Sequence, residues 1–242
     1  MRQTLLIVAR HPVPGHTKTR LCPPLSGAQA AALYENFLRD SLDMMRRVPN
    51  VKSAIAYLAE DATQHAAALR YFSNLAPDMT LTPQHGSDLG ERLHHLLHDA
   101  LAANPGAAVV MDSDSPTLPH IYVEQAFALL QGACDVVLGP CDDGGYYLIG
   151  LKKTQPRLLR EVRMSTPTVL ADTLTIAEEM GLQTCLLPVW YDVDTAVELQ
   201  RLQVELAQAQ DHVASHTRAY LATLSSAGRS IHAGLAGHPG AE

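Results

Sequence analysis

The sequence predicts one large α/β domain built on a mostly parallel sheet with helices on both faces. Short apolar runs alternate with helical patterns of roughly ten to twenty residues, which is typical of βαβ units. The run "VVLGPCDDGGYYLIGL" interrupts this alternation with a hairpin pattern, which predicts a mixed sheet with one antiparallel strand near the middle. We expect the domain to cover residues 1–224. Residues 225–242 are rich in Gly, Ala, Ser and His and are expected to form a mobile tail.

Apolar segments predict the strands, because a strand inside an α/β sheet is buried. In chain order they lie at residues 4–9, 51–59, 79–84, 107–114, 134–140, 145–151 and 182–190.

Helical periodicity and end signals predict the helices. Ser26 and Gln29 match a capping box, and Asp61 and Thr166 stand where helix caps are expected. Gly132 follows the fourth helical pattern and is expected to end it. The predicted helices lie at residues 26–48, 61–72, 87–104, 119–132 and 166–181, with further helices from residue 194 to about 224.

Composition excludes several classes of protein. The chain has 242 residues, 47% of them hydrophobic, and a net charge of −7, which argues against a general nucleic-acid binder. No segment approaches the ~20 apolar residues that span a bilayer, and no signal peptide is apparent. We expect a soluble cytoplasmic protein. None of the four cysteines forms a CxxC motif, so scattered reduced thiols are expected.

A basic loop follows the first predicted strand. The segment "VARHPVPGHTKTRL", residues 8–21, concentrates Arg10, Lys18 and Arg20 in a net acidic chain. It matches neither the GxxxxGK[ST] nor the GxGxxG phosphate loop. Lys18 and Arg20, near Gly15, could still bind phosphate, since arginine offers a planar fork of donors and lysine a point charge. A solvated basic loop is the alternative.

Two acidic pairs follow later strands. Asp112 and Asp114 end one strand, and Asp192 and Asp194 repeat the spacing after another. Ligands of open α/β sheets bind at the carboxyl ends of strands, and a divalent cation relieves the repulsion between neighbouring carboxylates. Oxygen ligands indicate Mg²⁺ or Mn²⁺. The alternatives are a turn at the first pair and a helix cap, by Asp194 or Thr195, at the second.

Two glycine-containing segments could also contact a ligand. "HGSDLGERL" places Gly86 and Asp88 at a helix start, whose amides could receive an anion or a base edge, or which Asp88 could simply cap. "CDDGGYY" places Asp143 before Gly144 and Gly145, where the backbone could approach a ligand. An ordinary hairpin turn is the alternative there.

Taken in order, five motifs resemble those of a known family. "ARHPVPGHTKTRL", "GSDLGERL", "DSDSPTL", "GPCDDGGYYLIGL" and "DVDT" are similar to motifs of bacterial GT-A-like transferases, first described as a domain of unknown function. That family is often labelled as a glycosyltransferase associated with radical-SAM or arsenosugar genes. A more distant similarity links it to 2-phospho-lactate guanylyltransferase and the molybdenum-cofactor guanylyltransferases. The resemblance spans roughly residues 3–205.

The resemblance implies a three-layer nucleotide-diphospho-sugar transferase (GT-A) fold and a set of site residues. It implies a metal site of Asp114 and Asp194, with Asp112 and Asp192 as second choices. It implies that the nucleotide is bound by Ala9, Arg10, Gly15, Lys18, Arg20, Gly86 and Asp88. The implied acceptor-binding residues are Gly144, Gly145 and Tyr146. The implied catalytic residues are Lys18, Arg20 and Asp143.

Two reactions agree with these motifs. In the first and favoured one, a phosphorylated small-molecule acceptor attacks a nucleoside triphosphate in the presence of Mg²⁺, while Lys18 and Arg20 stabilise the departing pyrophosphate. In the second, a nucleotide sugar donates its sugar, and Asp143 serves as the base. A phosphatase of the haloacid-dehalogenase type and a non-catalytic nucleotide sensor are remote alternatives. Neither a nucleic-acid nor a membrane partner is expected, and a homodimer remains open.

Overall fold

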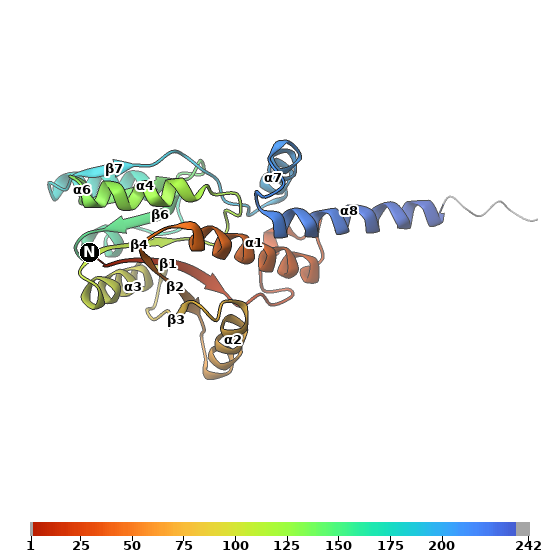
Figure 1. Cartoon of the computed structure of the whole chain (residues 1–242), viewed down its shortest axis with the longest axis horizontal. Coiled ribbons are helices and arrows are strands. Elements are labelled where there is room, and N and C mark those ends of the chain that lie inside the picture. Colours follow the sequence, from red (N-terminus) through yellow and green to blue (C-terminus); the bar gives the residue numbers. More distant parts are fainter. Residues whose placement is uncertain (1, 236–242) are drawn as a thin grey trace, which may run out of the picture.

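The computed structural model describes residues 2–235, and this part of the chain folds around a seven-stranded sheet (Figure 1). The strand order is β3-β2-β1-β4-β6-β5-β7. The strands are β1 Arg2–Arg10, β2 Val51–Leu58, β3 Thr80–Pro83, β4 Gly106–Met111, β5 Val136–Pro140, β6 Tyr146–Leu151 and β7 Thr184–Leu186. Strand β6 runs antiparallel to both β4 and β5, while the other pairs are parallel. The prediction of a mixed sheet with an antiparallel strand near its middle is therefore confirmed.

Helices cover both faces of the sheet. They are α1 Gly27–Arg47, α2 Ala62–Leu75, α3 Leu89–Ala103, α4 His120–Gln131, α5 Arg157–Arg160, α6 Val169–Glu179, α7 Ala196–Gln208 and α8 Ser215–Leu235, with a 3₁₀ turn η1 at Thr19–Leu21. The capping box of Ser26 with Gln29 is present at the start of α1, and Asp61 caps α2. Helix α6 begins at Val169, later than predicted, and its N-cap is Thr168 rather than Thr166.

Side-chain alternation along the central strands builds the two layers of the core, because successive residues of a strand point to opposite faces. Leu5 and Ile7 of β1 face the layer that contains α1, α2, α4 and α7, whereas Leu6 faces α3, α5 and α6. In β4, Val109 packs in the first layer and Val110 in the second. The expected three-layer arrangement is thus present, and all of these side chains are buried.

Two strands end three or more residues before their predicted ends. Strand β4 ends at Met111, so the predicted strand at residues 107–114 stops before its acidic residues. The amide of Asp114 donates to Asp112 Oδ1 at 3.0 Å, which turns the chain where the strand was expected to continue. The predicted strand at residues 182–190 contains only Thr184–Leu186 and an isolated bridge between Cys141 and Trp190.

Helix α8 packs against α1 near the end of the described chain. The carboxylate of Asp40 accepts hydrogen bonds from the amides of His216 and Thr217, at 3.0 and 2.8 Å, and so holds the first turn of α8. The helix then continues away from the rest of the molecule (Figure 1). The predicted domain boundary at residue 224 falls within α8. The final part of the predicted tail, residues 236–242, lies outside the described residues.

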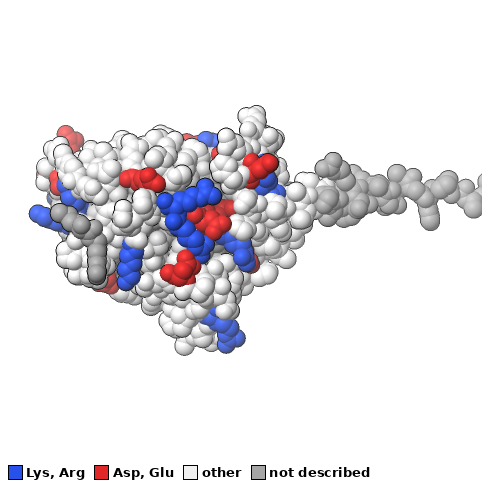
Figure 2. Space-filling model, in the orientation of Figure 1, with Lys and Arg blue, Asp and Glu red and all other residues white. Residues whose placement is uncertain are grey.

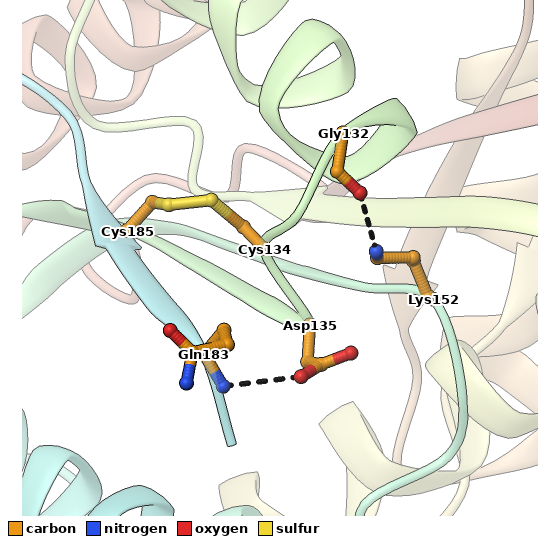
Figure 3. Close-up of a disulfide and its surroundings, with 6 residues drawn as sticks. All are labelled: Gly132, Cys134, Asp135, Lys152, Gln183 and Cys185. Atoms are coloured by element: carbon orange, nitrogen blue, oxygen red, sulfur yellow. Dashed lines mark hydrogen bonds between the residues drawn. A yellow bond between two sulfur atoms is a disulfide. The ribbon is translucent and has the colours of Figure 1, made fainter.

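A disulfide joins Cys134 to Cys185, so the expectation that all four cysteines are reduced is wrong (Figure 3). Strands β5 and β7 pair in parallel, and this brings the two Cα atoms to 5.9 Å, within the range that a disulfide spans. The amide of Gln183 also donates to Asp135 at 3.0 Å beside it. The residues are 51 positions apart, so their proximity depends on the sheet and leaves no local motif.

No helix within residues 2–235 is long and apolar enough to cross a membrane. On the face drawn in Figure 2, Lys and Arg side chains lie beside Asp and Glu side chains. The charge on that face is therefore mixed in sign.

Candidate functional site

A cavity of about 540 Å³ opens at the carboxyl ends of β1 and β4. Its size is typical of sites for small-molecule ligands. Basic residues, acidic residues and apolar residues of β1 and β2 all line it. The lining residues are Val8, Ala9, Arg10, His16, Thr17, Lys18, Thr19, Arg20, Tyr34, Leu58, Gln84, Leu89, Arg92, Asp112, Ser113, Asp114 and Asp194.

Lys18 lies at the centre of the charged part of this cavity. Its ammonium contacts Asp114 Oδ1 and Asp194 Oδ1, each at 2.7 Å, and donates to the carbonyl of Val193 at 2.9 Å. These contacts use all three N–H donors of the ammonium. The side chain is only 7% exposed. Burial alone would lower the pKa of Lys18, but the two carboxylates outweigh burial and raise it.

The loop that carries Lys18 is held by its own backbone. The hydroxyl of Thr17 accepts from the amide of Val13 at 2.9 Å, and Lys18 itself adopts a left-handed conformation with φ of 51° just before η1. Gly15 has φ of 77° and lies against Gly27, where an added Cβ would come within 2.8 Å of the Gly15 nitrogen. Gly15 does not line the cavity; the described geometry gives it a role in shaping the loop.

The other basic side chains of the cavity, Arg10, Arg20 and Arg92, are not held by buried ion pairs as Lys18 is. Arg20 contacts Asp194 Oδ2 at 3.2 Å and is 69% exposed. Arg10 lines the cavity and is exposed, while its backbone amide donates to the hydroxyl of Tyr34. Arg92 of α3 also lines the cavity, and its buried Nε has no hydrogen-bond partner among the described residues. An incoming anion could therefore meet Arg10, Arg20 and Arg92 without breaking a buried ion pair.

The two predicted acidic pairs meet at one edge of the sheet. The amide of Val193 donates to the carbonyl of Asp114 at 2.9 Å, which fastens the loop after β4 to the segment before α7. Thr195, not Asp194, caps α7, and its capping box includes Glu198. Asp194 is thus free to contact Lys18 and Arg20. Burial acts to raise the pKa of Asp194, but these two cations outweigh burial and lower it.

The other acid of each pair, Asp112 and Asp192, forms a cluster with the buried Cys141. One potential ligand atom from each of Asp112, Cys141 and Asp192 lies within 4.8 Å of the others. Asp192 Oδ1 accepts from Cys141 Sγ at 3.2 Å and from the hydroxyl of Ser115 at 3.0 Å. Burial, followed by the charges of Asp192 and Asp114, holds the pKa of Asp112 well above its ordinary value. The sequence predicted both aspartates, but it gave no signal for Cys141 or Ser115.

The carboxylates fit a divalent cation. Asp114 and Asp194 face the cavity with side chains 33% and 41% exposed, and carboxylate oxygen is the ligand that Mg²⁺ prefers. In the cluster with Cys141, Asp112 Oδ2 is withdrawn from solvent and has no hydrogen-bond partner in the described structure. A buried, unpaired carboxylate oxygen is costly unless a cation or a proton meets it.

Tyr34 and Ser113 line the cavity and contact each other. The two hydroxyls lie 2.7 Å apart, and both side chains are buried. Tyr34 thereby links helix α1 to the loop after β4. The sequence did not predict a role in the site for either residue, because a tyrosine within a helical pattern cannot be distinguished from an ordinary core residue.

At the start of α3, Asp88 is an ordinary cap. Its carboxylate accepts from the amide of Glu91 at 2.7 Å. Gly86 has φ of 140°, and an added Cβ would meet the backbone nitrogen of Arg92 at 2.9 Å. Neither Asp88 nor Gly86 lines the cavity, although Leu89 and Arg92 of the same motif do. A nucleotide-binding role for Gly86 and Asp88 therefore stays a prediction.

The predicted acceptor residues form a hairpin turn between β5 and β6. Asp143 Oδ1 accepts from the amide of Gly145 at 2.8 Å, and Gly144 has φ of 90°. A Cβ on Gly144 would come within 2.0 Å of the carbonyl oxygen of Pro167. The hydroxyl of Tyr146 lies 3.6 Å from the sulfur of Met164. Residues 143–146 lie outside the cavity lining, so their acceptor and catalytic roles stay predictions.

Comparison with known proteins identifies the class of enzyme and the family to which the chain belongs. A solved structure of a proposed nucleotide-diphospho-sugar transferase from Desulfovibrio desulfuricans G20 matches with a TM-score of 0.85 and 31% identity, over 93% of this chain and 95% of that one. With the fold, this likeness identifies the chain as a transferase. The chain belongs to the bacterial family described as "Uncharacterized protein conserved in bacteria (DUF2064)", whose profile matches residues 41–166.

More distant structures share the fold. CMP:2-keto-3-deoxy-manno-octonic acid synthetase complexed with CTP matches with a TM-score of 0.54 and 13% identity, over 86% of this chain and 99% of that one. A cytidylyltransferase from Leptospira borgpetersenii matches with a TM-score of 0.52 and 12% identity, over 93% and 96% of the two chains. A search of curated proteins gave no match.

Proposed function

We propose that this protein is a metal-dependent nucleotidyltransferase that uses a nucleoside triphosphate and a small phosphorylated acceptor. One observation carries the proposal: a single cavity joins the basic first loop to the carboxylates that follow β4 and β7. A triphosphate with its cation needs both kinds of group close together. The shared fold adds support, because one structure with this fold is described as a cytidylyltransferase and another as a synthetase complexed with CTP.

Different residues of the cavity suit the base and the phosphates of a nucleoside triphosphate. Val8, Ala9 and Leu58 offer an apolar surface for the base. Arg20 and Arg10, which are exposed, are placed to bind the phosphates. Both arginines can therefore bind an anion at small desolvation cost, and their planar donors suit phosphate oxygens.

Lys18 has a different task. Its charge is already desolvated and is fixed by two carboxylates, so it contributes a positive potential that needs little rearrangement during the reaction. In the proposed reaction an acceptor oxygen attacks the α-phosphorus, the bond to the bridging oxygen breaks, and pyrophosphate leaves. Lys18 and Arg20 stabilise the negative charge that develops on that leaving group.

Mg²⁺ would be held by Asp114 and Asp194, and when bound it supplies charge neutralisation to the phosphates. Ser113 and Tyr34 keep the loop of Asp114 in place. The carbonyl of Asp114 is further fixed by the amide of Val193.

Glycosyl transfer from a nucleotide sugar is the second candidate. It is favoured by the 31% identical protein from Desulfovibrio desulfuricans, which is described as a nucleotide-diphospho-sugar transferase. In that reaction the same cavity would bind a diphosphate, and Asp143 would act as the base. Asp143 is engaged with the amide of Gly145 and lies outside the cavity lining, which makes this second candidate the weaker one.

A thermal-shift panel distinguishes the two. The protein is heated with Mg²⁺ and each of GTP, CTP, UTP and ATP, and with UDP- and GDP-sugars. A ligand at ~100 times its Kd adds about 2.7 kcal/mol to stability, which for a chain of this size raises the midpoint by roughly 5–10 °C. We expect one nucleoside triphosphate to give the largest shift. A larger shift from a nucleotide sugar would overturn nucleotidyl transfer in favour of glycosyl transfer.

A further inference from the structure

We propose that Asp112, Cys141 and Asp192 form a second cation site, which binds a thiophilic divalent ion of the Zn²⁺ class beside the cavity that Asp112 lines. This ion is separate from the Mg²⁺ that would accompany a nucleotide, and its binding does not depend on the proposed reaction.

The three potential ligand atoms already have nearly the required spacing. They lie within 4.8 Å of one another, and Cys141 Sγ is 3.2 Å from Asp192 Oδ1. With Zn–S and Zn–O bonds of about 2.3 and 2.1 Å, two ligands in a tetrahedral site lie about 3.5 Å apart. Small side-chain adjustments therefore suffice to complete the site.

The backbone holds the three ligand segments together. The amide of Asp112 donates to the carbonyl of Tyr147 at 3.0 Å. The amide of Asp142, next to Cys141, donates to the carbonyl of Trp190 at 3.1 Å, and the amide of Trp190 donates to Pro140 at 2.9 Å. The site is thus preorganised by β4, β5, β6 and the chain after β7.

An independent observation points to a cation. Asp112 Oδ2 is buried and has no hydrogen-bond partner in the described part of the chain. The buried lysine nearby, Lys18, contacts Asp114 and Asp194 and leaves the other two carboxylates without it. Asp112 and Asp192 are half-buried, and two neighbouring carboxylates with no cation between them repel each other unless one of them holds a proton. A divalent ion would resolve the repulsion and also provide a partner for the orphaned oxygen.

The cysteine determines which ion binds. Mg²⁺ takes oxygen ligands, whereas a thiolate favours Zn²⁺ or Co²⁺. Cys141 is 5% exposed, and in the free protein its thiol donates to Asp192. When the ion binds, the S–H bond breaks, the proton leaves to solvent, and the sulfur coordinates as thiolate. With three protein ligands, one position of a tetrahedral site stays open.

Cobalt provides a direct test, because a thiolate bound to Co²⁺ gives a charge-transfer band in the near ultraviolet. The metal-free protein is titrated with Co²⁺ in the absence of nucleotide and reductant. Cys134 and Cys185 are joined in the disulfide, so Cys22 and Cys141 are the two free thiols. We expect the band in wild type and in Cys22→Ser, and its loss in Cys141→Ser.

Further measurements check that the variants are folded and that the ion is bound by these three residues. Circular dichroism checks that Cys141→Ser is folded, and Asp112→Asn, which keeps the thiol, should weaken Co²⁺ binding by at least tenfold. Zn²⁺ should abolish the cobalt band at equimolar concentration, while a hundredfold excess of Mg²⁺ should leave it. Absence of the band in wild type, its persistence in Cys141→Ser, or its displacement by Mg²⁺ would each overturn the proposal. Nucleotide binding with Mg²⁺ is measured separately on Cys141→Ser, so failure of this site is distinct from failure of the proposed function.

Discussion

The two carboxylate pairs of the site have the same chemistry and opposite environments. Asp114 and Asp194 form an outer pair that faces the cavity and shares the ammonium of Lys18. Asp112 and Asp192 form an inner pair that contacts hydroxyl, thiol and amide groups. The pKa of Asp194 is therefore lowered, by cations that outweigh its burial, while burial and neighbouring charges raise the pKa of Asp112. Each Asp-x-Asp motif of the sequence thus contributes one aspartate to the outer pair, whose charge is balanced by cations, and one to the inner pair, whose charge is not.

The disulfide at the opposite end of the sheet is a reference for this comparison. Its removal should have the largest effect on the free energy of unfolding. Replacing Cys134 and Cys185 by serine opens a loop of 51 residues, which should lower the free energy of unfolding by about 2–4 kcal/mol. Urea unfolding measures the loss. Because the disulfide lies at the start of β5, away from the carboxyl ends, the Co²⁺ titration of the double variant should match wild type. A changed Co²⁺ affinity would show that the two ends are coupled.

Removing the cation of the outer pair should have an effect of similar size. Lys18→Ala leaves Asp114 and Asp194 close together with only the exposed Arg20 as a counter-charge, and we expect a loss of about 2–4 kcal/mol in the free energy of unfolding. The carboxylates are partly exposed, which limits the cost. Chemical denaturation measures it, and Lys52→Ala, at an exposed position of β2, is the matched control. Equal stability of the two variants would mean that Lys18 does not hold the outer pair together.

Neutralising one acid in each pair should give effects of opposite sign. With a chelator present, Asp114→Asn removes a partner of Lys18 and should destabilise the protein by about 1–2 kcal/mol. Asp112→Asn relieves the repulsion within the inner pair, and its amide can donate to Asp192, so stability should rise by about 1 kcal/mol. Thermal unfolding of both variants gives the signs. The same sign for both would refute the distinction between the pairs.

The smallest effect on stability is expected at Arg20. Its side chain is 69% exposed, so Arg20→Ala should change the free energy of unfolding by less than about 0.5 kcal/mol. Loss of a charge-assisted phosphate contact should still weaken nucleoside triphosphate binding by roughly tenfold. Fluorescence or calorimetric titration measures this, with Arg70→Ala on α2 as an exposed control. Equal affinity of the two variants would remove Arg20 from the phosphate site.

Much of this arrangement was predictable from the sequence. The apolar runs placed β1 and β4, and the rule that ligands gather at carboxyl ends brought Lys18 and Asp194 together although 176 positions separate them. The direct ion pair between them was not predicted, because the sequence does not show whether a lysine faces a carboxylate or solvent.

Two features depended on tertiary structure and could not be predicted. Cys141 looked like part of a turn, and only the pairing of the chain around Trp190 places it beside Asp192. Arg92 lines the cavity because α3 packs against the sheet, whereas Asp88, the more conspicuous residue, caps that helix. Local motifs predicted the regions of the site, and packing selected which side chains reach it.

Calorimetric titration of nucleotide with Mn²⁺ into wild type and Asp114→Asn tests the proposed site most directly. The nucleoside triphosphate that gives the largest thermal shift is used, and Lys52→Ala serves as the control. The account predicts that binding to wild type requires Mn²⁺ and that Asp114→Asn weakens it at least tenfold while remaining folded. Binding to Asp114→Asn that is as tight and as dependent on Mn²⁺ as in wild type would contradict it.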